Sequence, residues 1–393
     1  MEQTRSNLIL FQLGFRPFFL AAVIVSLIFM SIWTAMYSFG WAYTFPRMSS
    51  IHWHAHEMLF GYGMAVIAGF LLTAVGNWTG QPALKGTGLM LPFSLWVAAR
   101  MASILDLPFT PWVMLICDMG FWFLVSLAVM KPILRVKQWR QTGIMAKLIL
   151  LGGANLAFYA GIMGWFVDGI RWELYGGLYL IIGLVLTMGR RVIPFFTERG
   201  VGYPVQLKNW LWLDLSAIVV FLLFFVWELL YPGSKVSAHF ALALFVLHIL
   251  RVSGWLTNGI WKRPLLWSLF AAYFFMISGF LIHAGSRYFG WNPFLAVHAF
   301  AMGGIGVITL SMMARVFLGH TGLSIHEPPP KLAVALTMIV IGVFFRVFFP
   351  LAWPQDYRLW IGIAQALWIG AFGVYLILYF PILTRPRIDG LPG

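Results

Sequence analysis

The chain has 393 residues, of which 61% are hydrophobic and 10% charged, and its formal net charge is +14. With a mean hydropathy of +0.86, this composition excludes an ordinary soluble globular protein and is typical of a polytopic membrane protein. The basic residues lie in short segments between long apolar runs, so we expect no nucleic-acid partner and instead a lipid bilayer around the chain. The single cysteine, Cys117, excludes an intramolecular disulfide.

Apolar runs of about 20 residues, long enough to cross a bilayer as helices, recur along the whole chain. Proline and glycine clusters such as the three prolines at 328–330 separate them. We therefore expect an all-α fold, a polytopic transmembrane helix bundle of about 12 spans that forms a single integral membrane domain over 1–393. The expected spans lie near 17–38, 52–75, 86–104, 110–130, 144–166, 171–190, 209–231, 236–256, 265–287, 293–316, 331–349 and 357–381.

The distribution of lysine and arginine sets the expected orientation. If the amino terminus is cytoplasmic, most basic residues fall in inner segments, among them Lys131, Arg135, Arg190 and Arg191. The positive-inside rule then predicts that both termini are cytoplasmic, as an even number of spans requires.

This orientation gives each histidine an expected depth in the membrane. Most of them fall in the outer half, and an imidazole near hydrocarbon is costly unless it is hydrogen-bonded or binds a metal. The outer group is His52, His54, His56, His239, His283 and His298, with His248 about halfway down its span and His320 and His326 on the inner side.

His54 and His56 are the strongest metal-ligand candidates because they occur as a pair. Two residues advance a helix by about 200°, so the two rings point to opposite faces and can serve two centres or two sides of one. His298 is the third candidate ligand, although polar contacts between helices explain a single buried histidine equally well. Met58 and Met302 each follow a histidine, His54 and His298, by four residues, and imidazole with a thioether favours copper.

Glu57 directly follows His56, and a carboxylate beside metal-binding imidazoles can orient a ligand or pass on a proton. We therefore take Glu57 as the candidate catalytic acid, with capping of a helix start as the alternative. Asp118, Asp214 and Glu228 rank below it because no second titratable residue adjoins them in sequence.

His248 and Arg251 form a candidate cofactor-binding pair within one span. Arg251 lies about one helical turn after His248, and a buried guanidinium needs an anion. A haem propionate would meet this need, and so would a neighbouring acid such as Asp214. No CxxCH motif is present, so any haem would be held without thioether bonds, as haem b is.

Several motifs together resemble the NnrS family, a set of bacterial inner-membrane haem and copper proteins of nitric oxide metabolism. The resemblance implies a twelve-helix protein of the bacterial inner (cytoplasmic) membrane, with His54, His56, His298 and His320 at motif positions. Phe270 stands where relatives often have a histidine, so no ligand is carried over from the ninth span. The motifs are GFRPFF at 14–19, WHAHEMLFG at 53–61, GFLLTAV at 69–75 with NWTG at 77–80, GRRVIPFFT at 189–197 and RVFLGHTG at 315–322.

From the residues and this resemblance we expect a haem–copper membrane enzyme that binds nitric oxide and reduces it to nitrous oxide, protecting against nitrosative stress. The electron donor is not identified by the sequence. Two alternatives stay open: a transporter or metal-handling permease with a histidine-lined path, and a haem-based nitric oxide binder without turnover.

Overall fold

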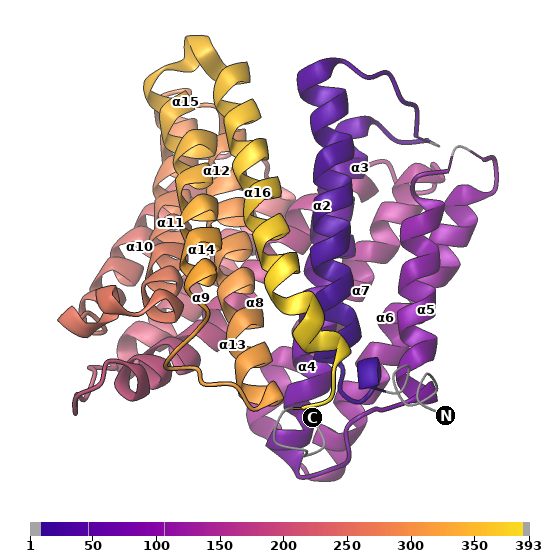
Figure 1. The fold of residues 1–393 in the computed structure, drawn as a ribbon. Coiled ribbons are helices and arrows are strands. Elements are labelled where there is room, and N and C mark those ends of the chain that lie inside the picture. The colour runs from indigo at the N-terminus through magenta and orange to yellow at the C-terminus, as the bar shows by residue number, and fades with distance from the viewer. Residues whose placement is uncertain (1–8, 46, 106, 388–393) are drawn as a thin grey trace. The chain divides into compact units, whose positions relative to one another are not determined.

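The computed structural model describes residues 9–45, 47–105 and 107–387, and this part of the chain forms helices and no β-strand (Figure 1). The expected all-α fold is therefore confirmed. The helices are α2 (Phe15–Phe39), α3 (Ser50–His56), α4 (Met64–Thr79), α5 (Thr87–Ala102), α6 (Thr110–Arg135), α7 (Thr142–Ile162), α8 (Gly169–Gly200), α9 (Leu211–Leu230), α10 (Lys235–Ser253), α11 (Pro264–Tyr288), α12 (Pro293–His298), α13 (Val307–Thr321), α14 (Pro330–Val343), α15 (Phe349–Ala352) and α16 (Tyr357–Thr384).

Three spans change locally from α-helix to the wider π-helix. These π-helical segments are η1 (Glu57–Gly63) between α3 and α4, η4 (Ala299–Gly306) between α12 and α13, and η5 (Phe344–Phe348) between α14 and α15. Such segments alter which side chains share a face and often lie at functional sites. Two of them follow directly after His56 and His298, which are predicted ligands.

Eleven helical segments in the described residues are long and apolar enough to cross a membrane. The twelfth expected span, 86–104, forms the 16-residue helix α5, which rises about 24 Å and is shorter than the roughly 30 Å hydrocarbon core. Its start is bonded to the segment before α2, through Gly86 N–H and the Phe11 carbonyl, and Ser103 just after its end contacts Trp53 of α3. Residues at both ends of α5 are therefore bonded to other segments of the chain.

The chain divides into two compact units. The first unit comprises Met1–Leu180, Val316–Ile325 and Phe372–Gly393, and the second comprises Ile181–Arg315 and His326–Ala371. In the first unit α2, α4, α5 and α6 pack side by side (Figure 1). In the second unit the largely buried α11 packs against α10, α12, η4 and α14. The expectation of a single domain over 1–393 stays a prediction.

The start of α2 and the end of α16 lie at the same end of the first unit. Arg16 is fully buried, and its Nη1 donates to the carbonyls of Leu383 at 2.8 Å and Arg385 at 3.0 Å. This pairing is what an even number of passes requires. Which end faces the cytoplasm stays a prediction.

Candidate functional site

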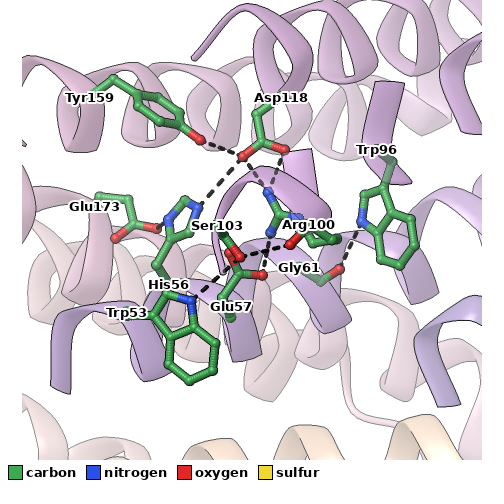
Figure 2. Close-up of polar contacts among 10 residues, drawn as sticks. All are labelled: Trp53, His56, Glu57, Gly61, Trp96, Arg100, Ser103, Asp118, Tyr159 and Glu173. Atoms are coloured by element: carbon green, nitrogen blue, oxygen red, sulfur yellow. Dashed lines mark hydrogen bonds and ion pairs between the residues drawn. The ribbon is translucent and has the colours of Figure 1, made fainter. Parts of the chain in front are cut away.

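A cluster of buried ionisable side chains lies in the first unit, where α3 meets η1. His56 is the last residue of α3 and Glu57 the first of η1, and both side chains are fully buried (Figure 2). Burying a charge among apolar helices is costly unless a partner of opposite charge is present. The partners come from three other helices, α5, α6 and α8.

Arg100, in the last turn of α5, connects two of the carboxylates. Its Nη1 donates to Glu57 Oε2 at 2.8 Å, and its Nη2 donates to the two carboxylate oxygens of Asp118 at 2.6 and 2.5 Å. Asp118, the ninth of the 26 residues of α6, also accepts a hydrogen bond of 2.5 Å from the Tyr159 hydroxyl of α7. The guanidinium therefore fixes the first residue of the π-helical segment to α6.

His56 lies between two further carboxylates. Its Nδ1 is 3.0 Å from Glu173 Oε1, and its Nε2 is 3.5 Å from Asp118 Oδ2. The imidazole also stacks on Phe158 of α7, with ring centroids 4.1 Å apart. Glu173 lies near the start of α8, 117 positions after His56, so this contact depends on the packing of helices that are far apart in sequence.

The cluster contains more acidic than basic groups. Three carboxyls, of Glu57, Asp118 and Glu173, meet one guanidinium and one imidazole, so full ionisation would leave an excess negative charge even with His56 protonated. In addition, Glu57 Oε1 and Glu173 Oε2 are buried and accept no hydrogen bond from the described residues. The arrangement can therefore take up a further proton inside an apolar bundle.

Neighbouring groups hold η1 in place. The Trp96 indole of α5 donates to the Gly61 carbonyl at 3.1 Å, which satisfies an acceptor within the π-helical segment (Figure 2). At Gly61 itself, an added Cβ would lie 2.6 Å from Glu57 Oε2 and 2.8 Å from Arg100 Nη1. Glycine is therefore needed at position 61 for the Glu57–Arg100 contact to form.

His54 faces a different helix from His56. Its ring stacks on Trp33 of α2 with centroids 4.4 Å apart and planes within 7°. The separation of the two rings onto α2 and α7 matches the opposite faces predicted from their spacing. The two imidazoles therefore do not converge on one ion within the first unit.

His298 lies in the second unit, at the junction of α12 and η4. Its Nδ1 is 2.8 Å from the Phe294 carbonyl, and both ring nitrogens are 3.0 Å from Nη2 of Arg346. Tyr357 OH lies 3.5 Å from the other terminal nitrogen of Arg346. The surroundings of His298 are thus basic, unlike those of His56.

His248 and Arg251 are brought together with the acid that the sequence analysis left as an alternative. Arg251 Nη2 donates to Asp214 Oδ1 at 2.9 Å, while its Nη1 is 3.1 Å from His248 Nδ1. Tyr273 OH is 2.6 Å from the same His248 nitrogen, and Arg190 of α8 also binds Asp214. Since a guanidinium only donates, His248 Nδ1 accepts from it, and Asp214, one of the two anions considered for Arg251, supplies a negative charge beside it.

The described residues contain single side chains that could each bind a metal, but no group of side chains arranged as a complete metal-binding site. Among the described residues, no three or more His, Cys, Asp or Glu side chains are grouped so that they could hold a metal ion. His248 Nε2, however, is buried and has no hydrogen-bond partner among these residues, so this nitrogen would be available to hold a haem iron. A haem needs one or two such protein ligands.

One further acid, Glu228, and two further histidines, His283 and His320, make structural contacts. Glu228 of α9 accepts from Arg287 at 2.5 Å and lies 3.5 Å from His283 Nε2, which ties α9 to the end of α11. His320, at the end of α13, packs on Phe15 with ring centroids 5.5 Å apart.

His56 and Glu57 are recognisable from the sequence, but much of their environment is not. No pattern in the sequence assigns Glu173, Tyr159 or Arg100 to this site, and Asp118 ranks low because no titratable residue adjoins it. The available signal was a lone charged residue within or beside an apolar run, which Arg100, Asp118 and Glu173 share. Such residues are expected to pair with one another inside a membrane protein.

Comparison with known proteins identifies one family. The family model described as NnrS protein matches residues 9–387, which is nearly the whole chain. No curated protein matches the chain closely enough to count as a relative.

Proposed function

The chain belongs to the NnrS family, a membership that supports a membrane protein connected with nitric oxide, and from this premise we propose that it binds nitric oxide and reduces it to nitrous oxide. In this proposal the protein lies in the bacterial inner membrane and protects the cell against nitrosative stress. Its apolar helices suit the substrate, because nitric oxide is small and apolar and partitions into the bilayer.

The reaction consumes protons inside an apolar protein. Two molecules of nitric oxide, two electrons and two protons give one nitrous oxide and one water. The electrons come from an external one-electron donor, and the protons must cross hydrocarbon to reach the reacting oxygen. A buried group that takes up a proton and releases it is therefore a requirement of this function.

The single observation that carries the proposal is the excess of buried carboxyls around His56. Glu57 is the proposed proton donor: Arg100 binds its Oε2, and its Oε1 accepts no hydrogen bond from the described residues. One oxygen is thus held in place while the other can carry a proton. Glu173, which contacts His56 on the far side from Asp118, provides a second position of the same kind.

The proposed prosthetic groups are haem b and copper. His248, through its buried Nε2, is the residue that best fits haem iron, and His54, His56 and His298 stay the proposed metal ligands. When bound, a reduced haem supplies iron that binds nitric oxide, and copper supplies a second metal for a second molecule. Arg251 stays a proposed haem contact, although Asp214 already binds its guanidinium.

The test is to purify the protein, record its visible spectrum before and after adding nitric oxide, and measure nitrous oxide with a reductant. The proposal expects a haem band that shifts with nitric oxide and nitrous oxide formation that falls by about a hundredfold or more in Glu57→Gln, with an unchanged spectrum. Asp168→Asn, at an exposed carboxyl, is the matched control.

Each other result has a defined meaning. Full turnover in Glu57→Gln removes Glu57 from the mechanism. A spectral shift without nitrous oxide supports a haem-based binder without turnover, and a colourless protein contradicts the haem proposal.

A further inference from the structure

Arg100, Arg251 and Arg287 each bind a carboxylate, whereas Arg315 of α13 contacts an aromatic ring. Arg315 belongs to the second unit and is only 8% exposed. Its guanidinium carbon lies 4.0 Å from the centre of the Phe196 ring of α8, well within the range of a cation–π contact. The ring holds the side chain in place but supplies no opposite charge.

No carboxylate neutralises the guanidinium of Arg315. Its Nε is buried and has no hydrogen-bond partner among the described residues, and none of their acidic groups forms an ion pair with it. The next acid along α8, Glu198, is bonded elsewhere, since its Oε1 accepts from the Leu207 N–H at 2.9 Å. A buried charge without an opposite charge is costly, so this guanidinium is suited to an anion that the chain itself does not supply.

The Arg315–Phe196 contact lies at the expected depth of the lipid headgroups. The sixth expected span ends at residue 190, and Phe196 follows in the same helix about 9 Å further along its axis. Arg315 likewise lies at the inner end of the span expected at 293–316. Because the headgroup layer on each side of a bilayer is about 5–8 Å thick, lipid phosphates are available at this level.

The surroundings of Phe196 combine an apolar surface with positive charge. Phe195 packs beside it with ring centroids 5.5 Å apart and is 52% exposed. The guanidinium of the exposed Arg199 lies 5.5 Å from the Phe195 ring. An exposed ring near two cations suits an amphiphilic anion, because the apolar part of such a molecule can cover the ring while its charged group meets a guanidinium.

We propose that Arg315, positioned by Phe196, binds a phosphate group, which comes either from an anionic phospholipid or from a free phosphate ion. A guanidinium forms paired, charge-assisted hydrogen bonds with phosphate oxygens, and contact of its face with a ring leaves the nitrogens at its edge available. The depth of the site and the exposed Phe195 favour the phospholipid. The site is separate from the carboxylate cluster at His56 and does not depend on the proposed function.

The test uses delipidated full-length protein in dodecyl maltoside, a detergent without phosphate. Dioctanoyl phosphatidylglycerol is titrated into the protein, and the bound lipid is counted by native mass spectrometry. We expect the wild type to bind this lipid at least about tenfold more tightly than Arg315→Gln does. Arg315→Lys should keep part of the affinity, since the charge stays while the paired geometry is lost. Dioctanoylglycerol, which has the same acyl chains and no phosphate, should bind to the wild type and to Arg315→Gln equally.

A second titration distinguishes the two sources of the phosphate. If inorganic phosphate displaces the lipid and raises the midpoint of thermal unfolding in the wild type but not in Arg315→Gln, the ligand is a free phosphate ion. If inorganic phosphate does not reduce lipid binding, the ligand is the phospholipid. Both results support the assignment of Arg315 to a phosphate group.

Matched variants test whether the position of the charge matters. Lys331→Gln, at an exposed lysine at the start of α14 in the same unit, removes one positive charge and should behave as the wild type. Phe196→Leu keeps the charge but removes the ring, so it should weaken lipid binding less than Arg315→Gln does. Size-exclusion profile and helical circular dichroism identify a variant that fails to fold. If Arg315→Gln does so, Arg315→Lys decides, and an unchanged affinity in it would contradict paired binding by the guanidinium.

Three results would overturn the inference. The first is equal affinity of the wild type and Arg315→Gln for both phosphate compounds. The second is an equal loss of affinity in Lys331→Gln, which would mean that any positive charge on this unit attracts the lipid. The third is the same dependence on Arg315 for dioctanoylglycerol, which would remove the phosphate from the interaction.

Discussion

Arg100 Nη1 lies 2.8 Å from Glu57 Oε2, and this contact joins the last turn of α5 to the first residue of the π-helical segment η1. The same guanidinium binds Asp118 of α6. One arginine therefore offsets the charge of two buried carboxylates on different helices. Its removal should lower the free energy of unfolding of the protein.

Replacing Arg100 by glutamine should strongly destabilise the protein. The change leaves two buried carboxylates without their cation, and breaking a buried ion pair on one side costs about 3–5 kcal/mol. Denaturant unfolding in detergent, followed by circular dichroism, measures the change in free energy of unfolding. Arg171→Gln, which removes a solvent-accessible pair between the partly exposed Arg171 and the exposed Asp168, is the control and should cost less than about 1 kcal/mol. Equal stabilities of the two variants would contradict this view of Arg100.

Alanine at Gly61 should separate Glu57 from Arg100. The new Cβ would lie within 3 Å of both side chains, so one of them must move, at a cost of about 1–3 kcal/mol. Thermal unfolding of Gly61→Ala is compared with that of Gly153→Ala, where an added Cβ has no neighbour within 4 Å. A lower midpoint for Gly61→Ala alone is expected. An unchanged midpoint would mean that η1 accommodates a side chain at position 61.

Asparagine at Asp214 should weaken the second unit. Asp214 binds both Arg190 and Arg251, so its neutralisation leaves two guanidinium groups without this carboxylate. Because Asp214 and Arg190 are partly exposed, solvent screens the loss, and we expect about 1–3 kcal/mol rather than the value for Arg100. Denaturant unfolding gives the comparison, with Asp356→Asn as the exposed control. A loss as large as that of Arg100→Gln would show that solvent does not reach this pair.

The helices could be predicted from sequence because each depends on a continuous apolar run within its own residues. Pro92 and Arg100 interrupt the apolar run of the span expected at 86–104, and this is the expected span that is not among the eleven segments long and apolar enough to cross a membrane. The His56–Glu57 pair was recognisable because its members are adjacent. Glu173 was not, because its contact with His56 depends on how α8 packs against α3, which no local pattern specifies.

The pair His248 and Arg251 illustrates the same limit within one helix. Their spacing predicted that the two side chains would meet, and Arg251 Nη1 is indeed 3.1 Å from His248 Nδ1. The anion beside Arg251 was left open between a haem propionate and an acid. The contact between Arg251 and Asp214 depends on the packing of α9 against α10, so it could not be predicted from the sequence of one helix.

Alanine at His54, His56 or His298 should lower the content of bound metal, because an imidazole nitrogen is lost from each proposed contact. The His54 ring stacks on Trp33 whereas the His298 ring contacts Arg346, so the two imidazoles have different surroundings and we expect their loss to affect different groups rather than the same one. Copper is measured by mass spectrometry and haem by its pyridine complex, both per mole of folded protein. His239→Ala is the matched control, since His239 is exposed and contacts Tyr288. Full occupancy of both groups in a variant would remove that histidine from the ligand set. Parallel loss of both groups in His54→Ala and in His298→Ala would instead indicate one shared centre.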